Sequence, residues 1–213
     1  MSAKSLRELF VEELRDMYDG EKRLTRALPK MARAAESGEL QTALRSHLKE
    51  TERQVTRLEQ VFRSVGEKPR GKKCDGIMGI VEEGNKAMEE FEGPVLDAAL
   101  IAGAQKVEHY EIASYGTLAY FADLLENDRA KELLGETLDE EKAADQKLTT
   151  IARSRVNRKA LLAGDESEEE PSSGLRIPQA VRSAAASMGL AYDRRPSSGR
   201  SSGRRRSTTR RSR

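Results

Sequence analysis

Four long stretches of this chain repeat apolar residues every three or four positions, which is the spacing of one face of an α-helix. Each stretch therefore predicts an amphipathic helix that must bury its apolar face against neighbouring helices. The composition agrees, because Ala, Leu, Glu, Lys and Arg dominate, Trp is absent and charged residues make up 35% of the chain. The expected helices cover about residues 5–35, 38–65, 94–125 and 128–162.

The connections between these helices restrict the topology. Turns at Ser37-Gly38 and at residues 126–128 are short, whereas about 30 residues separate the two helical pairs. The long connection holds a Gly- and Lys-rich loop, 66–76, and a short helix, 77–91. Two antiparallel hairpins joined by one long crossover predict an all-α, ferritin-like four-helix bundle with an extra helix in the crossover. We also expect Pro29 to kink or interrupt the first helix.

The cellular setting follows from what the sequence lacks. No stretch is apolar enough to span a bilayer, and the N-terminus has no continuous apolar segment typical of a secretory signal. The single cysteine, Cys74, cannot form an internal disulfide, and we expect it to be a small residue in a loop. These features favour a reducing, cytoplasmic location without membrane association.

Charge divides the chain into an acidic body and a basic tail. Residues 171–213 contain eleven Arg and one Asp, a net charge of +10, so residues 1–170 carry −8 of the total of +2. From Gly164 onward the helical pattern is lost, and the end of the chain is low-complexity Arg, Ser and Gly. We therefore predict a helical bundle over 1–163 and a disordered basic tail over 164–213.

Ionisable residues interrupt all four apolar stripes: acids lie within three of them, and on the second helix His47 lies within the stripe and Glu50 on its adjoining edge. Carboxylates are almost never fully buried unless paired, and several that converge need cations between them. Carboxylate and imidazole ligands suit iron or manganese, and helical bundles hold metal pairs with this ligand set. The candidate ligands are Glu21 on the first helix, His47 and Glu50 on the second, Glu108 and Glu111 on the third, and Glu141 on the fourth.

The candidate ligands also agree in height along the bundle. The midpoint of Glu21 and Glu50 lies beside the first turn, and the midpoint of Glu111 and Glu141 lies at the second turn. Each of these two pairs of residues therefore lies about 15 residues, or roughly 22 Å, from the turn of its hairpin. If the two hairpins turn at opposite ends, all four helices meet at one level in mid-bundle.

Other interpretations stay open for single residues. Each acid taken alone could lie at a solvated stripe edge or pair with Lys or Arg, and His47 alone could be a satisfied core histidine. His109 lies one residue off its stripe, so we expect it behind the ligands or at the surface, and Asp145 is a weaker ligand candidate. Tyr18 and Tyr115 are expected in the core, where a tyrosine near two irons could take part in redox chemistry.

Several segments resemble the YciE/YciF family of bacterial ferritin-like proteins. The resemblance covers about residues 5–160, including the crossover, and five segments match in order. The matching segments are LTRALPKMARAAESGEL (24–40), SHLKETERQVTRLEQVF (46–62), KKCDGIMGIVEEGN (72–85), KVEHYEIASYGTL (106–118) and ETLDEEKAADQKL (136–148).

This resemblance implies a ferritin-like core with an additional helix, a homodimer, a di-iron-type centre and a loose association with stress responses. The sequence departs from the commoner ferritin and rubrerythrin pattern at two places. The second helix reads His47-x-x-Glu50 rather than Glu-x-x-His, and Ala144 stands where a second histidine is usual. Glu108-x-x-Glu111 does match the rubrerythrin type of third helix.

Three functional hypotheses follow. The leading one is a stress-related protein with two iron ions, or manganese, that oxidises Fe(II) with O₂ or peroxide. The alternative is a non-enzymatic dimeric helical protein of stress or interaction. The tail suggests a third activity, which is sequence-independent contact with DNA phosphates. The alternative is that the tail is only a solubilising extension. The tail residues concerned are Arg204, Arg205, Arg206, Arg210 and Arg211.

Overall fold

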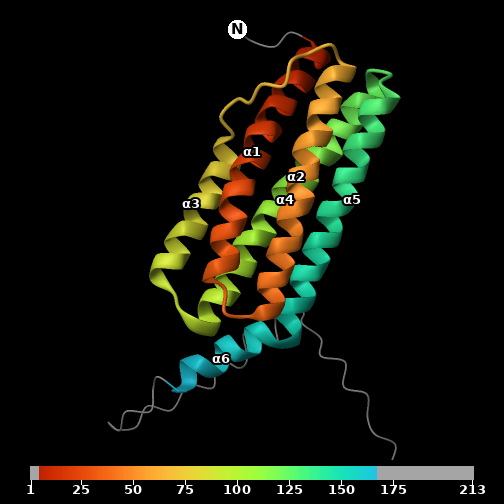
Figure 1. The fold of residues 1–213 in the computed structure, drawn as a ribbon. Helices are drawn as coiled ribbons and strands as arrows, with labels where there is room; N and C mark the ends of the chain where they lie inside the picture. Colours follow the sequence, from red (N-terminus) through yellow and green to blue (C-terminus); the bar gives the residue numbers. More distant parts are fainter. Residues whose placement is uncertain (1–4, 167–213) are drawn as a thin grey trace, which may run out of the picture. The chain divides into compact units, whose positions relative to one another are not determined.

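The computed structural model describes residues 5–166, and within them every regular element is helical (Figure 1). The four long helices lie where the apolar spacing predicts them, and the shorter α3 lies in the crossover. The elements are α1 (Leu6–Ala34), α2 (Gly38–Ser64), α3 (Asp75–Glu90), α4 (Gly93–Leu124), α5 (Asp128–Ile151), the π-helical stretch η1 (Ala152–Val156) and α6 (Asn157–Glu166).

The two hairpins turn at opposite ends of the bundle, as Figure 1 shows. At one end, Asp97 near the start of α4 accepts backbone N–H groups of Glu36 and Ser37 at 2.8 and 2.9 Å, which ties it to the α1–α2 turn. At the other end, the Asn127 side chain of the α4–α5 turn donates to the carbonyl of Ser64 on α2. With α1 packed on α4 and α2 on α5, the predicted ferritin-like topology is confirmed.

Helix α3 lies along the outside of α1 and α4, and together with the loop that precedes it α3 leads the chain from one end of the bundle to the other (Figure 1). Gly76 is required here, because a Cβ atom at this position would lie 2.4 Å from the Tyr110 ring. The Tyr110 hydroxyl donates to Asp16 on α1 at 2.9 Å and lies 3.5 Å from the Cys74 sulfur. Cys74 is therefore a buried cap of α3, just inside the end of the expected loop.

Capping residues mark the predicted ends of the helices. Ser37 and Asn127 cap α2 and α5 through their side-chain oxygens. Gly66 and Glu126 follow α2 and α4 with positive φ angles of 73° and 56°. The backbone N–H groups of each of these residues and of the residue after it donate to carbonyl oxygens in the last turn of the helix. Helix α1 continues through Pro29 to Ala34, so the alternative of an interruption at this proline was wrong.

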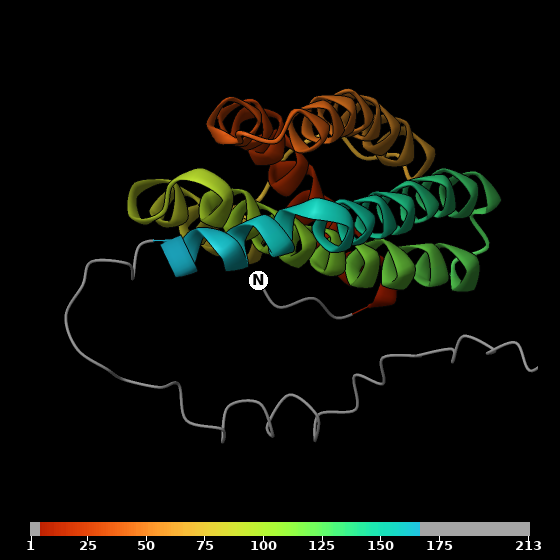
Figure 2. The ribbon, with the colours of Figure 1, turned by 90° about the horizontal axis from the view of Figure 1, so that it is seen from below.

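Helix α5, the fourth long helix, is followed by two further helical segments, η1 and α6. After the π-helical stretch η1, α6 turns across the end of the bundle and packs against α4 (Figures 1 and 2). A π-helical turn is a common cause of a bend in a helix. Over residues 5–166, no helix combines the length and the apolar character needed to cross a membrane.

The apolar core consists of two clusters stacked along the bundle. One includes Leu24, Leu44, Leu100 and Leu148, and it extends to Ile77 of α3. The other surrounds Phe10, Phe62, Tyr115 and Leu134 near the α4–α5 turn. Between the two clusters, each helix of the bundle passes through a short section whose buried side chains are polar.

Candidate metal centre

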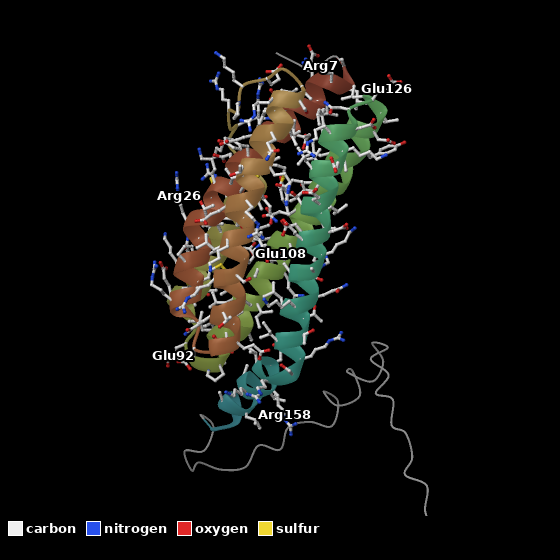
Figure 3. All side chains as sticks on the ribbon, turned by 45° about the vertical axis from the view of Figure 1, so that its right-hand side comes forward. Arg7, Arg26, Glu92, Glu108, Glu126 and Arg158 are labelled. Carbon is white, nitrogen blue, oxygen red and sulfur yellow. The ribbon has the colours of Figure 1, made fainter. Side chains whose placement is uncertain are left out.

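The section between the two apolar clusters is a layer of buried polar side chains, which we call the polar layer. The side chain of Glu108 lies midway along the bundle, between α2 and α5, whereas Glu126 and Glu92 lie at its two ends (Figure 3). No ordinary apolar core contains so many acids at one height. The polar layer comprises Glu21 of α1, His47, Thr51 and Gln54 of α2, Glu108 and Glu111 of α4, and Thr137 and Glu141 of α5.

His47 is the centre of one half of the polar layer. Its Nε2 atom lies 3.3 Å from Glu108 Oε1 and 3.8 Å from Glu141 Oε2. Its Nδ1 atom lies 3.5 Å from Glu50 Oε2, toward the surface. Together with Glu111, the residues His47, Glu108 and Glu141 offer four ligand atoms within 4.8 Å of one another. An imidazole nitrogen and three carboxylate oxygens at this spacing can hold a metal ion.

Glu21 and Glu111 form the other half of the polar layer. Both side chains are buried, at 0% and 1% exposure, and their carboxyl groups interact directly. The Tyr115 hydroxyl, also fully buried, donates a hydrogen bond to Glu21 Oε1. Tyr115 thus belongs to the core, as expected, but its hydroxyl also orients one of the candidate ligands.

Buried oxygens without a hydrogen-bond donor distinguish this layer from a satisfied polar core. Buried polar groups are nearly always hydrogen bonded, and an unpaired one costs about 1–3 kcal/mol. Here no N–H or hydroxyl group reaches five side-chain oxygens, four of them on acids from three different helices. The five atoms are Glu21 Oε2, Gln54 Oε1, Glu108 Oε2, Glu111 Oε1 and Glu141 Oε2.

Burial raises the pKa of Glu21, Glu108 and Glu111 well above the usual range, and the neighbouring carboxylates raise it further. The pKa of Glu141 is also raised, chiefly by burial. Within residues 5–166, no Lys or Arg forms an ion pair with these four acids. The residues therefore fit a cation site, because several of their oxygens accept no hydrogen bond and no Lys or Arg in the described part of the chain balances the carboxylate charges.

A second set of side chains holds the layer in place from the side of α2 and α5. Gln54 donates to Glu141 and to Glu140, the latter at 3.0 Å. Arg57 forms a bidentate pair with Glu140 at 2.8 and 3.0 Å and also donates to Thr137 at 2.8 Å. Sequence reasoning missed Gln54, although it follows His47 by seven residues and therefore shares its helix face.

The remaining sequence candidates lie farther from this cluster. Glu50 contacts His47 but keeps a side chain that is 32% exposed, and this contact lowers its pKa. His109 is at the surface, 70% exposed, and lies 3.4 Å from Asp145, which accepts a hydrogen bond from Gln105. The Tyr18 hydroxyl donates to Glu59 at 2.9 Å, outside the polar layer. The arginines predicted to contact nucleic acid, at 204–206, 210 and 211, lie outside the described residues.

Known proteins share this fold and much of this sequence. The family model described as "Domain of unknown function (DUF892)" matches residues 5–161. Protein YciF of Escherichia coli K12 is 50% identical over 162 residues, which cover 75% of this chain and 98% of YciF. The crystal structure of the E. coli stress protein YciF matches with a TM-score of 0.71 and 49% identity, over 73% of this chain and 99% of that one.

Two further solved structures share this fold. YcfI from Rhodopseudomonas palustris is 46% identical, with a TM-score of 0.67 over 69% of this chain and 94% of that one. A Xanthomonas campestris protein is 20% identical, with a TM-score of 0.58 over 76% of this chain and 99% of that one, and it shares the fold. The chain therefore belongs to the YciF-like DUF892 family.

Proposed function

We propose that this protein is a carboxylate-bridged di-iron protein that oxidises Fe(II) with O₂ or peroxide, with manganese as the alternative metal. The observation that carries the proposal is the set of donor-free oxygens of Glu21, Glu108, Glu111 and Glu141 around His47. A buried polar layer with no cation would cost several kcal/mol, because each unpaired group contributes about 1–3 kcal/mol.

The charge of the layer supports a pair of divalent ions rather than one. Four buried carboxylates carry four negative charges when they ionise, and two divalent cations neutralise them. The two halves of the layer, one around His47 and one around Glu21 and Glu111, supply a ligand set for each ion. Carboxylate ligands with one imidazole are compatible with iron and manganese.

The protein's own residues have distinct roles in this proposal. Glu108 and Glu141 lie closest to His47, and Glu21 is oriented by Tyr115 while Glu141 is oriented by Gln54. The apolar clusters on either side exclude bulk water from the layer. Iron bound here supplies the redox chemistry, and the acids with raised pKa accept or release the protons that accompany binding.

Oxygen consumption tests the proposal. Fe(II) added aerobically to metal-free protein is expected to consume O₂ faster than buffer and to produce a ferric absorption band. Glu108→Ala and Glu111→Ala each remove a carboxylate of the polar layer, and we expect both to lose this acceleration. Glu82→Ala is the matched control, because Glu82 is an exposed acid on α3. Equal rates in wild type, Glu108→Ala and buffer would reject the proposal.

A second candidate function is a non-enzymatic dimeric helical protein of stress or interaction that retains a metal for stability. The observation that favours it is the shortage of histidine, since His47 is the one imidazole in the polar layer and Ala144 stands near it. Under this alternative, purified protein would carry metal and lose melting temperature on chelation, yet would show no turnover of Fe(II).

The homodimer and the nucleic-acid contact are separate proposals. The dimer rests on the family resemblance, and light scattering of the full chain would contradict it by showing a monomer or a very large assembly. The DNA contact rests on the charge of +10 over residues 171–213. Full-length protein is expected to retain DNA in a salt-dependent way, and a version ending at Gly164 is not; equal retention would reject the idea.

A further inference from the structure

A small cavity opens beside the polar layer on the side of α2 and α5. Its volume is about 20 Å³, enough for roughly one water-sized molecule. Figure 3 views the bundle from a direction in which the Glu108 side chain is visible between these two helices. The cavity is lined by Ala43, Leu44, His47 and Glu50 of α2, Glu108 of α4, and Ala144, Lys147 and Leu148 of α5.

The inner wall of the cavity is part of the polar layer. His47 and Glu108 are both more than nine-tenths buried, at 7% and 2% exposure, and both face this space. Glu108 Oε2 has no hydrogen-bond donor. The cavity therefore reaches the same atoms that we propose as metal ligands, whereas the apolar cavity beside α3 does not include them.

Ala144 is one of the small side chains that line this space. Ala144 lies three residues after Glu141, so both side chains share one face of α5. In di-metal bundles, a histidine three residues after such a glutamate fills this direction with its imidazole. Here the side chain ends at Cβ, and Ala43 on α2 forms the opposite wall with an equally small side chain.

The mouth of the cavity differs in chemistry from its walls. Glu50 and the exposed Lys147 lie at the solvent side, while Leu44 and Leu148 line the sides. A space of about 20 Å³ excludes molecules of more than a few atoms. The positive charge of Lys147 and the negative charge of Glu50 oppose each other there, so the lining favours neither anions nor cations by charge alone.

We infer that this cavity, lined by Ala144, is the place where a small exogenous ligand of two or three atoms, such as O₂, peroxide or azide, binds beside the metal centre. The inference rests on the proposed metal centre and adds to it the site of access. It assigns to Ala144 the role of keeping one side of that centre free of protein ligands. Exchangeable ligands then occupy a position that other di-metal bundles give to histidine.

Azide titration of the cobalt(II)-loaded protein tests this inference without measuring turnover. Azide is expected to change the visible spectrum of the wild-type protein in a saturable way. Ala144→Leu fills the cavity from α5 and Ala43→Leu from α2, and each should weaken azide binding at least about tenfold with cobalt content unchanged. Ala143→Leu is the matched control, because Ala143 is the exposed neighbour of Ala144 and should behave as wild type.

The outcomes separate this inference from the proposed function. If wild type binds cobalt but azide leaves the spectrum unchanged, or binds all variants equally, the cavity is not the ligand site and the metal centre stands. If wild type binds no cobalt, the metal centre fails and this inference with it. Circular dichroism checks folding, and if one filled variant does not fold, the other carries the test from the opposite wall.

Discussion

Replacing Glu111 by glutamine should raise the free energy of unfolding of the metal-free protein. The same change should reduce the stability that the protein gains from bound metal. Glu111 is 1% exposed and its carboxyl group contacts Glu21, so the pair cannot carry two charges without a cation between them. Glutamine has almost the same shape, and its amide N–H can donate to Glu21. The variant Glu111→Gln therefore keeps the packing and removes one group that must hold a proton in the metal-free state.

The size of the effect depends on pH. Because burial raises the pKa of Glu111 well above its usual value, the folded metal-free chain keeps a proton that the unfolded chain loses above about pH 4.3. The free energy of unfolding therefore falls as pH rises from there to the folded pKa, by about 1.4 kcal/mol per pH unit for each retained proton. Glu111→Gln should remove one such contribution to the slope.

Urea unfolding of chelator-treated protein at pH 5, 6 and 7, followed by circular dichroism, measures this slope. We expect a shallower decline for Glu111→Gln than for wild type, and no change for Glu82→Gln, whose side chain is 63% exposed. With metal added at about 100 times its dissociation constant, wild type should gain about 2.7 kcal/mol for each bound ion, or about 5.4 kcal/mol for two, and the variant less. A wild-type protein with no pH dependence, or a variant with the wild-type slope, would refute this reasoning.

Three further predictions concern the scaffold that positions the polar layer, each measured by urea or thermal unfolding. Asp97→Ala should lose about 1–3 kcal/mol of stability, because two backbone N–H groups of the α1–α2 turn lose their acceptor; an unchanged midpoint would contradict this. Gly76→Ala should cost about 1–3 kcal/mol, because the added Cβ overlaps the Tyr110 ring and α3 must shift; Gly84→Ala, in open space on the same helix, should not. Glu126→Gly should add about 1 kcal/mol, because glycine accepts the φ of 56° without the Cβ penalty; lower stability would count against it.

The fold could be predicted from the sequence because its signals are local. Apolar spacing, the turn at Ser37-Gly38 and the break at Gly93 place the helices up to residue 125 to within a few residues, whereas the last one, expected through 162, is interrupted by η1 after Ile151. The contrast between short turns and one long crossover then leaves the ferritin-like topology as the best arrangement. The continuation of α1 through Pro29 was not predictable in this way, because tertiary packing decides whether a proline ends a helix.

The candidate site was only partly predictable. The common height of the candidate ligands was predictable, because residues equidistant from the turn of an antiparallel hairpin lie at one level. The structure brings together His47, Glu108, Glu111 and Glu141. That they bind metal stays a prediction. Glu50 was expected on the edge beside the second stripe, and its side chain is accordingly partly exposed, at 32%. Gln54, which donates to Glu141, was not predicted, because only acids and histidines were considered as ligands.

The most direct test of the central claim is the number of metal ions that the protein binds. Anaerobic equilibrium dialysis of metal-free protein against Fe(II), followed by elemental analysis, counts them per chain. The polar layer predicts about two ions per chain in wild type and in Glu82→Ala, since its four carboxylates match two divalent charges. Loss of both ions is expected in the double variant Glu108→Ala/Glu111→Ala. Fewer than about one ion per wild-type chain, or equal binding by the double variant, would contradict the account.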